Sequence, residues 1–174
     1  SIIPEEAGEY SKTNIQVEGV DEADVVKNDA RYIYFANQNG VFIIDTLFDN
    51  MYSLKTVSFI PQELYHSKNY LVVFGLKQNS GFTIMVFDIS NLNNISISRE
   101  FSFENSTYIS SRKIDDDFYF ILRNPYVYNE TKQVAILPKY SDSLAGNKTL
   151  DISQIKIMGH QRRYFSHNLI ISFN

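Results

Sequence analysis

Apolar residues alternate with polar ones, or gather in short runs, along most of this 174-residue chain. Two such runs, residues 31–36 and 41–45, are separated by the turn residues Asn37-Gln38-Asn39-Gly40. Because Asn and Gly adopt positive φ at little cost, this arrangement predicts a β-hairpin. The same arrangement returns at 70–75 and 82–88, on either side of a Lys-Gln-Asn-Ser-Gly turn.

Each predicted hairpin is flanked by further candidate strands. Segments 54–59 and 95–101 alternate apolar with polar residues, as half-buried strands do, which predicts an outer strand behind each hairpin. Strands that lead into the hairpins are expected at 24–27 and 63–66, and a similar strand at 108–113 precedes a third unit. Each unit is therefore expected to have four strands.

The third unit contains the acidic run Asp115-Asp116-Asp117, which occupies the turn position before an apolar segment. Tyr32 and Tyr70 are 38 residues apart, and Tyr70 and Phe118 are 48 apart. Periods of about 40 to 50 residues with four strands each are typical of β-propeller blades. The sequence therefore predicts an all-β fold of propeller blades, each a four-stranded antiparallel sheet.

The expected domain organisation is a lead-in segment, 1–18, followed by a partial propeller, 19–174. The expected blades cover about 19–60, 61–104 and 105–174. After Arg123 the rhythm gives way to a stretch rich in Pro, Asn, Tyr and Ser, which predicts an irregular insertion at about 124–165.

Residues 166–173 resemble the third strand of a blade, so the propeller is expected to be incomplete, with about three blades. Closed propellers typically have about 4 to 8 blades. The rest of the fold is therefore expected either in a continuing polypeptide or in a complementary chain.

One motif in this chain is long enough to be specific. Residues 11–29, followed by Tyr32-Ile33-Tyr34, closely resemble the opening signature of a secreted archaeal and bacterial β-propeller family described as distantly related to WD-type repeats. A departure is Ala30, where that family usually has a turn Gly, which indicates a slightly different start of the hairpin. The resemblance continues in the same order through segments 61–65, 71–75, 86–90, 110–112 and 137–143. It implies an extracytoplasmic protein, often at the cell surface, with no established chemistry.

Composition narrows the classes of function. Hydrophobic residues make up 44% of the chain and aromatic residues 14%, enough for a packed core. A net charge of −4 without any basic block disfavours nucleic-acid binding. The absence of Cys excludes disulfides, thiolate metal sites and a Cys nucleophile. No membrane span is expected in this chain, because its longest apolar run, 70–76, is far shorter than the roughly 18 residues required.

The first candidate site is Asp21-Glu22-Ala23-Asp24. These four letters also name a helicase group, but the Gly-Lys-Ser/Thr loop that a helicase needs is absent. Together with Asp29, the motif offers carboxylate oxygens to a hard cation such as calcium, although its spacing differs from an EF-hand loop. The competing interpretation is that these carboxylates cap turns and accept backbone hydrogen bonds, and the sequence favours it. No other cofactor is expected.

Other polar groups also invite a function. The run Asp115-Asp116-Asp117 is expected to be a solvated turn rather than a metal site. Arg162 and Arg163, in the most basic and aromatic patch, would hold an anionic glycan or a partner's carboxylate, although such a patch is more often a solvated strand edge. Structural or surface roles are expected for the three histidines, which lack metal-pair spacing: His66, His160 and His167.

The N-glycosylation acceptor pattern Asn-x-Ser/Thr occurs four times, at Asn94, Asn105, Asn129 and Asn147. All four fall in predicted turns, strand ends or the insertion, as solvent-facing sugars require. In an exported protein, N-linked glycans are therefore expected on most of them.

Two functions are consistent with these patterns. The favoured one is an extracytoplasmic, N-glycosylated β-propeller module, archaeal in origin, with a binding or structural role at the cell envelope or an appendage. Its partners would be other envelope proteins or copies of itself. The alternative is a secreted propeller hydrolase acting on glycans or peptides through carboxylates around a central channel. No catalytic residue can be named for it, and no Gly-x-Ser-x-Gly elbow occurs.

Overall fold

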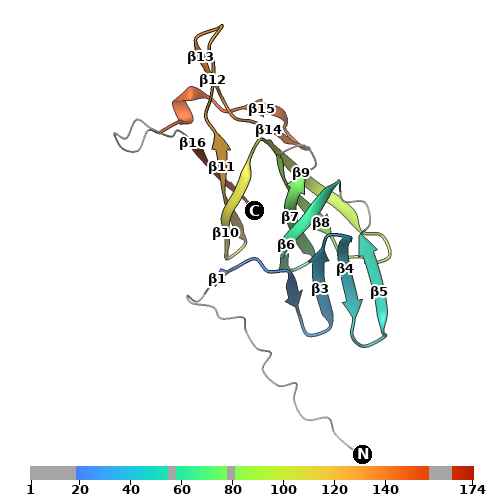
Figure 1. Cartoon of the computed structure of the whole chain (residues 1–174). Helices are drawn as coiled ribbons and strands as arrows, with labels where there is room; N and C mark the ends of the chain where they lie inside the picture. Colours follow the sequence, from blue (N-terminus) through green and yellow to red (C-terminus); the bar gives the residue numbers. More distant parts are fainter. Residues whose placement is uncertain (1–18, 55–57, 78–80, 157–165) are drawn as a thin grey trace, which may run out of the picture.

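The structure, a computed structural model, describes residues 19–54, 58–77, 81–156 and 166–174. Within these ranges the chain forms antiparallel sheets and a single short 3-10 helix, so the expected all-β class is confirmed. Three sheets stand side by side, each built mainly of consecutive strands as propeller blades are (Figure 1). They are called blades one, two and three here.

Blade one has the strand order β2 (Val26–Asn28), β3 (Tyr32–Asn37), β4 (Gly40–Asp45) and β5 (Asn50–Leu54). The hairpin expected at the Asn–Gly turn is confirmed: Asn37 pairs with Gly40, whose φ of +138° suits glycine. The outer strand of blade one is β5, earlier than the expected 54–59: Leu54 belongs to β5, Phe59 already belongs to blade two, and 55–57 lie outside the described residues. Both residues are buried, so the alternation joined the ends of two different strands.

Blade two begins with β6 (Phe59–Ser67), β7 (Tyr70–Lys77), β8 (Gly81–Asp88) and β9 (Ser96–Glu104). The second predicted hairpin is confirmed by continuous antiparallel pairing of β7 with β8. The sheet does not end at β9. A further hairpin, β14 (Lys139–Asp142) and β15 (Gly146–Thr149), pairs with β9 through β14 and widens the sheet to six strands.

Blade three contains β10 (Thr107–Ile114), β11 (Asp117–Pro125) and β16 (Ser166–Phe173). The acidic run forms the tight turn between β10 and β11, with Asp115 at a φ of +52°, as expected. β16 pairs along β11, which confirms it as the third strand. A two-residue strand, β1 (Val20–Asp21), lies on the other edge of β10.

The segment expected to be irregular is more ordered than its composition indicates. β12 (Val127–Asn129) and β13 (Val134–Ile136) form a separate hairpin that projects beyond the blades in Figure 1. The β14–β15 hairpin follows, and then the 3-10 helix η1 (Ile152–Gln154), whose N-cap is Asp151. These strands are three or four residues long and largely exposed, so they carry no apolar run that would reveal them.

Blade two is buried on both faces. Along β7, Leu71 and Val73 belong to the cluster shared with blade one, whereas Val72 and Phe74 belong to the cluster shared with blade three. This division follows from the period of two in a strand. The continuous apolar run in the sequence is therefore the pattern of a strand covered on both sides.

Candidate functional site

The acidic motif lies in a segment that contacts all three blades, residues 19–28, which we call the strap. β1, near its start, pairs with β10 of blade three. Asp24 then exchanges two backbone hydrogen bonds, of 3.2 and 2.8 Å, with Leu64 of β6 in blade two. β2, at its end, is the first strand of blade one. The strap thus covers parts of strand edges that would otherwise be open, and it joins the three blades.

The carboxylates of the strap have cationic or backbone partners. Lys27 Nζ lies 2.8 Å from Asp21 Oδ1 and donates to the Glu22 backbone carbonyl at 2.5 Å. Glu22 Oε1 lies 3.0 Å from Arg112 Nη2 of blade three, and Asp24 Oδ1 accepts from the next backbone amide at 2.6 Å. The described residues contain no group of three or more acidic or histidine side chains arranged to hold a metal ion. The calcium hypothesis therefore gains no support from the geometry.

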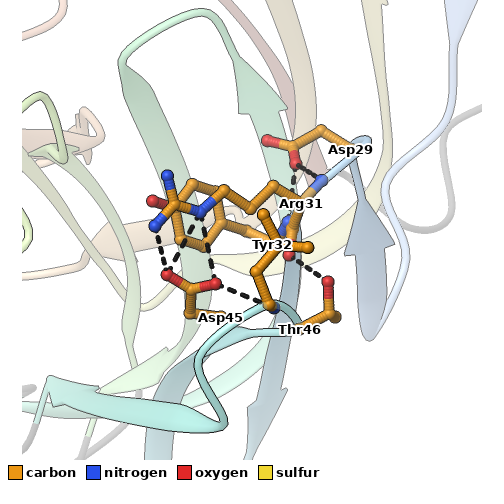
Figure 2. A network of polar contacts seen from close by, with 6 residues as sticks. Asp29, Arg31, Tyr32, Asp45 and Thr46 are labelled. Carbon is orange, nitrogen blue, oxygen red and sulfur yellow. Dashed lines mark hydrogen bonds and ion pairs between the residues drawn. The ribbon is translucent and has the colours of Figure 1, made fainter. Parts of the chain in front are cut away.

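Asp29, the remaining carboxylate of that hypothesis, organises the turn into blade one (Figure 2). Its Oδ1 accepts from the amides of Arg31 at 2.8 Å and Tyr32 at 2.7 Å, and its Oδ2 accepts from the Tyr34 hydroxyl at 2.7 Å. Partial burial acts to raise the pKa of Asp29, but these bonds outweigh it and the pKa is lowered. Asp29 therefore caps a turn, as the favoured interpretation expected. Ala30 within this turn does not adopt positive φ, so glycine is not needed there.

His66 of blade two packs against the same corner. Its ring stacks on Tyr34 with 4.4 Å between centroids, and its Nε2 lies 3.8 Å from Asp29 Oδ2. Burial lowers the pKa of His66, although the Asp29 carboxylate opposes that effect. The structural role expected for this histidine is thus a packing role between blades one and two.

Two arginine–aspartate pairs of similar geometry hold strand ends. Arg31 contacts Asp45 through Nη2 at 2.6 Å and through Nε at 3.1 and 3.2 Å, as Figure 2 shows. Arg99 contacts Asp142 through Nη2 at 2.8 Å and Nε at 3.1 Å. The arginine lowers the pKa of the aspartate in each pair.

These pairs show that the turn between β14 and β15 has the same hydrogen-bonding pattern as the turn between β4 and β5. Each aspartate also accepts from the amide two residues further on, in Asp45-Thr46-Leu47 and in Asp142-Ser143-Leu144. The middle residue of each triplet bonds back beside its arginine: the Thr46 amide donates to the carbonyl of Arg31 itself, and the Ser143 amide donates to the carbonyl of Glu100, next to Arg99. This likeness of three residues is the trace that the shared corner leaves in the sequence, and it is too short to predict the extra hairpin by itself.

A second cluster of polar side chains lies next to the strap, where β6 of blade two meets β10 of blade three. The Tyr65 and Tyr108 hydroxyls lie 2.8 and 2.9 Å from Ser111 Oγ. Tyr108 also donates to Glu63 Oε2 at 3.3 Å. Partial burial raises the pKa of Glu63; the bond from Tyr108 works against that effect and the charge of Asp24 adds to it. Glu63 is therefore a carboxyl group that retains its proton to higher pH than an exposed one.

A β-bulge lies next to each residue of the Glu63–Tyr108 hydrogen bond. The pairing of β6 with β7 shifts register directly before Glu63, and the pairing of β10 with β11 shifts directly after Tyr108. Bulges re-aim side chains and are common beside functional sites. Opposite the first bulge, a Cβ on Gly75 would lie 1.9 Å from the Ile60 carbonyl oxygen, so only glycine fits. No sequence signal marks this group, because its two strands are far apart in the chain.

The four glycosylation acceptors differ in accessibility. Asn94 and Asn105 lie exposed in the turns before and after β9, and Asn147 is exposed within β15. Asn129 is half-buried at the end of β12, and its Oδ1 accepts from the Lys132 amide at 2.9 Å. None is buried in a strand centre, although Asn147 lies in a strand that the sequence pattern did not predict.

Some expectations lie beyond what the structure describes. Arg162, Arg163 and His160 are outside the described residues. Among the described residues, no helix has the length and apolar character to cross a membrane.

Comparison with known proteins places this arrangement of sheets in a family. The family model described as "Beta propeller domain" matches residues 10–174. An uncharacterized protein of Methanocaldococcus jannaschii is 31% identical over 129 residues, which are 71% of this chain and 20% of that protein. The chain thus spans about a fifth of the length of this relative. No solved structure matches.

Proposed function

This chain belongs to the β-propeller domain family, and on that basis we propose that it is an N-glycosylated module of the extracytoplasmic space. Its role is binding or structural, at the cell envelope or an appendage of an archaeon. Its partners are N-linked glycans and other envelope proteins or copies of itself. The similarity to a Methanocaldococcus jannaschii protein supports the archaeal source.

The observation that carries this proposal is the placement of the acceptor asparagines. Asn94, Asn105 and Asn147 are exposed, so each has room for a sugar without displacing core residues. Asn147 lies on β15, the outermost strand of the six-stranded sheet. A glycan on that strand would hinder pairing of its open edge with another sheet.

Peptide mass spectrometry of the protein from its native source tests the proposal. Sugar is expected on Asn94 and Asn105, and least on Asn129, whose side chain is half-buried and hydrogen-bonded. Treatment with an enzyme that releases N-glycans should shift the mass of the same peptides. Four bare asparagines in native protein would overturn the glycoprotein assignment.

The hydrolase alternative has one observation in its favour. Glu63 has a raised pKa, is influenced by Asp24, and is held by Tyr108 between two bulges. A carboxyl group that keeps its proton to higher pH is suited to general acid catalysis. Incubation with panels of glycans and peptides tests it: turnover that Glu63→Gln abolishes and that Glu130→Gln, in the exposed turn between β12 and β13, leaves intact supports hydrolysis, and absence of turnover at any pH counts against it.

A further inference from the structure

We infer that the pocket between blades one and two binds a neutral saccharide, through tyrosine side chains on one wall and asparagine amides on the other. The inference rests on the binding role proposed above and names a class of ligand for it. It requires no sugar on any asparagine of the chain.

The pocket lies at one end of the interface between blades one and two. Its volume is about 410 Å³, which is in the size range of sites for small organic ligands. One wall comes from β3, β5 and the turn before β3, and the other from the β6–β7 turn and the loop after β8. The Ile89 amide donates to the Asn69 carbonyl at 2.8 Å, so the turn and the loop of blade two form one continuous wall.

Three tyrosines form the wall on blade one. Tyr34 and Tyr52 both pair with Ile43, so all three side chains leave the sheet on the same face. Tyr32 is two residues before Tyr34 on β3 and therefore shares that face, which packs against blade two. Tyr34 is buried and stacks on His66, which fixes the inner part of the wall. Tyr32 and Tyr52 are half-buried, and neither hydroxyl has a hydrogen-bond partner among the described residues.

Side-chain amides dominate the wall on blade two, where Asn69, Asn91 and Asn93 are all exposed. Asn91 Oδ1 accepts from the Asn93 amide at 3.1 Å, which fixes the loop. The side chains of Asn69 and Asn93 have no hydrogen-bond partner within the described part of the chain. An asparagine amide both donates and accepts, as a sugar hydroxyl does, so this wall is suited to a ligand rich in hydroxyl groups.

Charge separates a neutral sugar from other ligands. Among the described residues that line the pocket, only Asp29 and Lys68 are charged. Asp29 accepts from two backbone amides and from the Tyr34 hydroxyl, and Lys68 Nζ lies 2.6 Å from Asp116 Oδ2. Because both charges have partners within the protein, an anionic ligand would gain little here. The tyrosine rings match the apolar faces of a sugar ring, and the amides match its hydroxyls.

Isothermal titration of the unglycosylated protein with the neutral sugars maltotriose, mannotriose and tri-N-acetylchitotriose tests the inference, with trigalacturonate as the anionic control. At least one neutral sugar should bind about tenfold more tightly than trigalacturonate. The double variant Asn69→Ala/Asn93→Ala should weaken that binding about tenfold, since the hydrogen bonds of two amides are lost. Asn39→Ala, in the exposed turn at the opposite end of β3, should leave it unchanged. Unaltered melting temperatures would show that the variants stay folded.

Three results would each exclude this pocket as a neutral saccharide site: no binding of any neutral sugar, equal binding of trigalacturonate, or full affinity in the double variant. Adenosine that bound more tightly than every sugar would identify a site for a flat aromatic ligand instead. Bare asparagines in native protein would defeat the glycoprotein proposal while leaving these titrations unaffected. Failure of the titrations would leave any sugar found on the acceptor asparagines in place, so the two failures are distinguishable.

Discussion

The interface between blades one and two and the interface between blades two and three use opposite faces of the same strands, yet their composition differs. The first is mainly aliphatic, with residues such as Val41, Ile43 and Leu71. The second is rich in aromatic rings, with Phe74, Phe82 and Phe120 among its buried members. A repeated blade therefore conserves the shape of its sheet but not the chemistry by which neighbouring sheets are held.

The aromatic interface has specific ring geometry. Phe120 meets Phe74 edge to face at 5.0 Å and stacks on Phe173 at 6.0 Å. In the aliphatic interface, Phe87 is equally buried but makes no ring contact with any described residue. Ring pairs stabilise by about 0.5–1.5 kcal/mol beyond the burial of area, so the second interface depends more on individual side chains.

Truncation of Phe120 should have the largest effect. Phe120→Ala is expected to lower the free energy of unfolding by about 3–5 kcal/mol, the usual range for a buried Phe. Phe87→Ala should also destabilise the protein, but its loss should be about 0.5–1.5 kcal/mol smaller than that of Phe120→Ala, because no ring pair is lost. Urea unfolding of both variants measures the difference. Equal losses would show that ring geometry does not distinguish the two interfaces.

Gly75 lies on β7, the strand that both interfaces share. Gly75→Ala should destabilise the protein by about 1–3 kcal/mol or more, because the new Cβ would displace the Ile60 carbonyl and the bulge before Glu63. Gly146→Ala is the matched control, since Gly146 has open space around it and only an unfavourable φ of +77°; about 1 kcal/mol is expected there. Thermal melts of both variants suffice, and a Gly75→Ala protein as stable as Gly146→Ala would contradict the close approach.

Local pattern was enough to predict the parts of this fold that rest on neighbouring residues. The Asn37–Gly40 hairpin, the turn at Asp115 and the capping by Asp29 all depend on residues a few positions apart. The strand expected at 24–27 matches β2 at the end of the strap. The pairing of its start with blade three was not predictable, because a two-residue strand such as β1 has no periodicity and its partner β10 lies about ninety residues away. The addition of β14 to blade two was hidden for the same reason.

The candidate site shows the same limit. Glu63 and Tyr108 are brought together by two bulges and by the docking of two blades, none of which leaves a mark in the local sequence. Acceptor asparagines, by contrast, were readable from the sequence because their motif is local.

The two interfaces should also respond differently to pH, beginning with Asp29 at the first. A lowered folded-state pKa means that the charged carboxylate stabilises the protein above its ordinary value of 3.8, and that this contribution disappears as the pH falls through the folded value. Asp29→Asn keeps an oxygen for the Arg31 and Tyr32 amides but loses the charge and the acceptor of the Tyr34 hydroxyl. It should therefore cost about 1 kcal/mol at neutral pH, and progressively less below pH 3.8. A stability difference that stays constant down to acid pH would rule out this charge effect.

Glu63, at the second interface, should show the opposite sign and the smallest effect. Its folded-state pKa is raised above the ordinary 4.5, so the native protein is most stable when the carboxyl group is protonated. That stability is lost as the pH rises through the folded-state pKa. Glu63→Gln keeps the shape and a hydrogen-bond acceptor for Tyr108 but removes the charge. The variant is expected to be more stable than the parent at neutral pH, and the gain should vanish as the pH falls below 4.5. Parallel denaturation curves of the parent, Glu63→Gln and Asp29→Asn across pH measure both signs at once. If Glu63→Gln were less stable at neutral pH, the carboxylate would be a net stabiliser of the blade two–three interface, and the contrast with Asp29 would be lost.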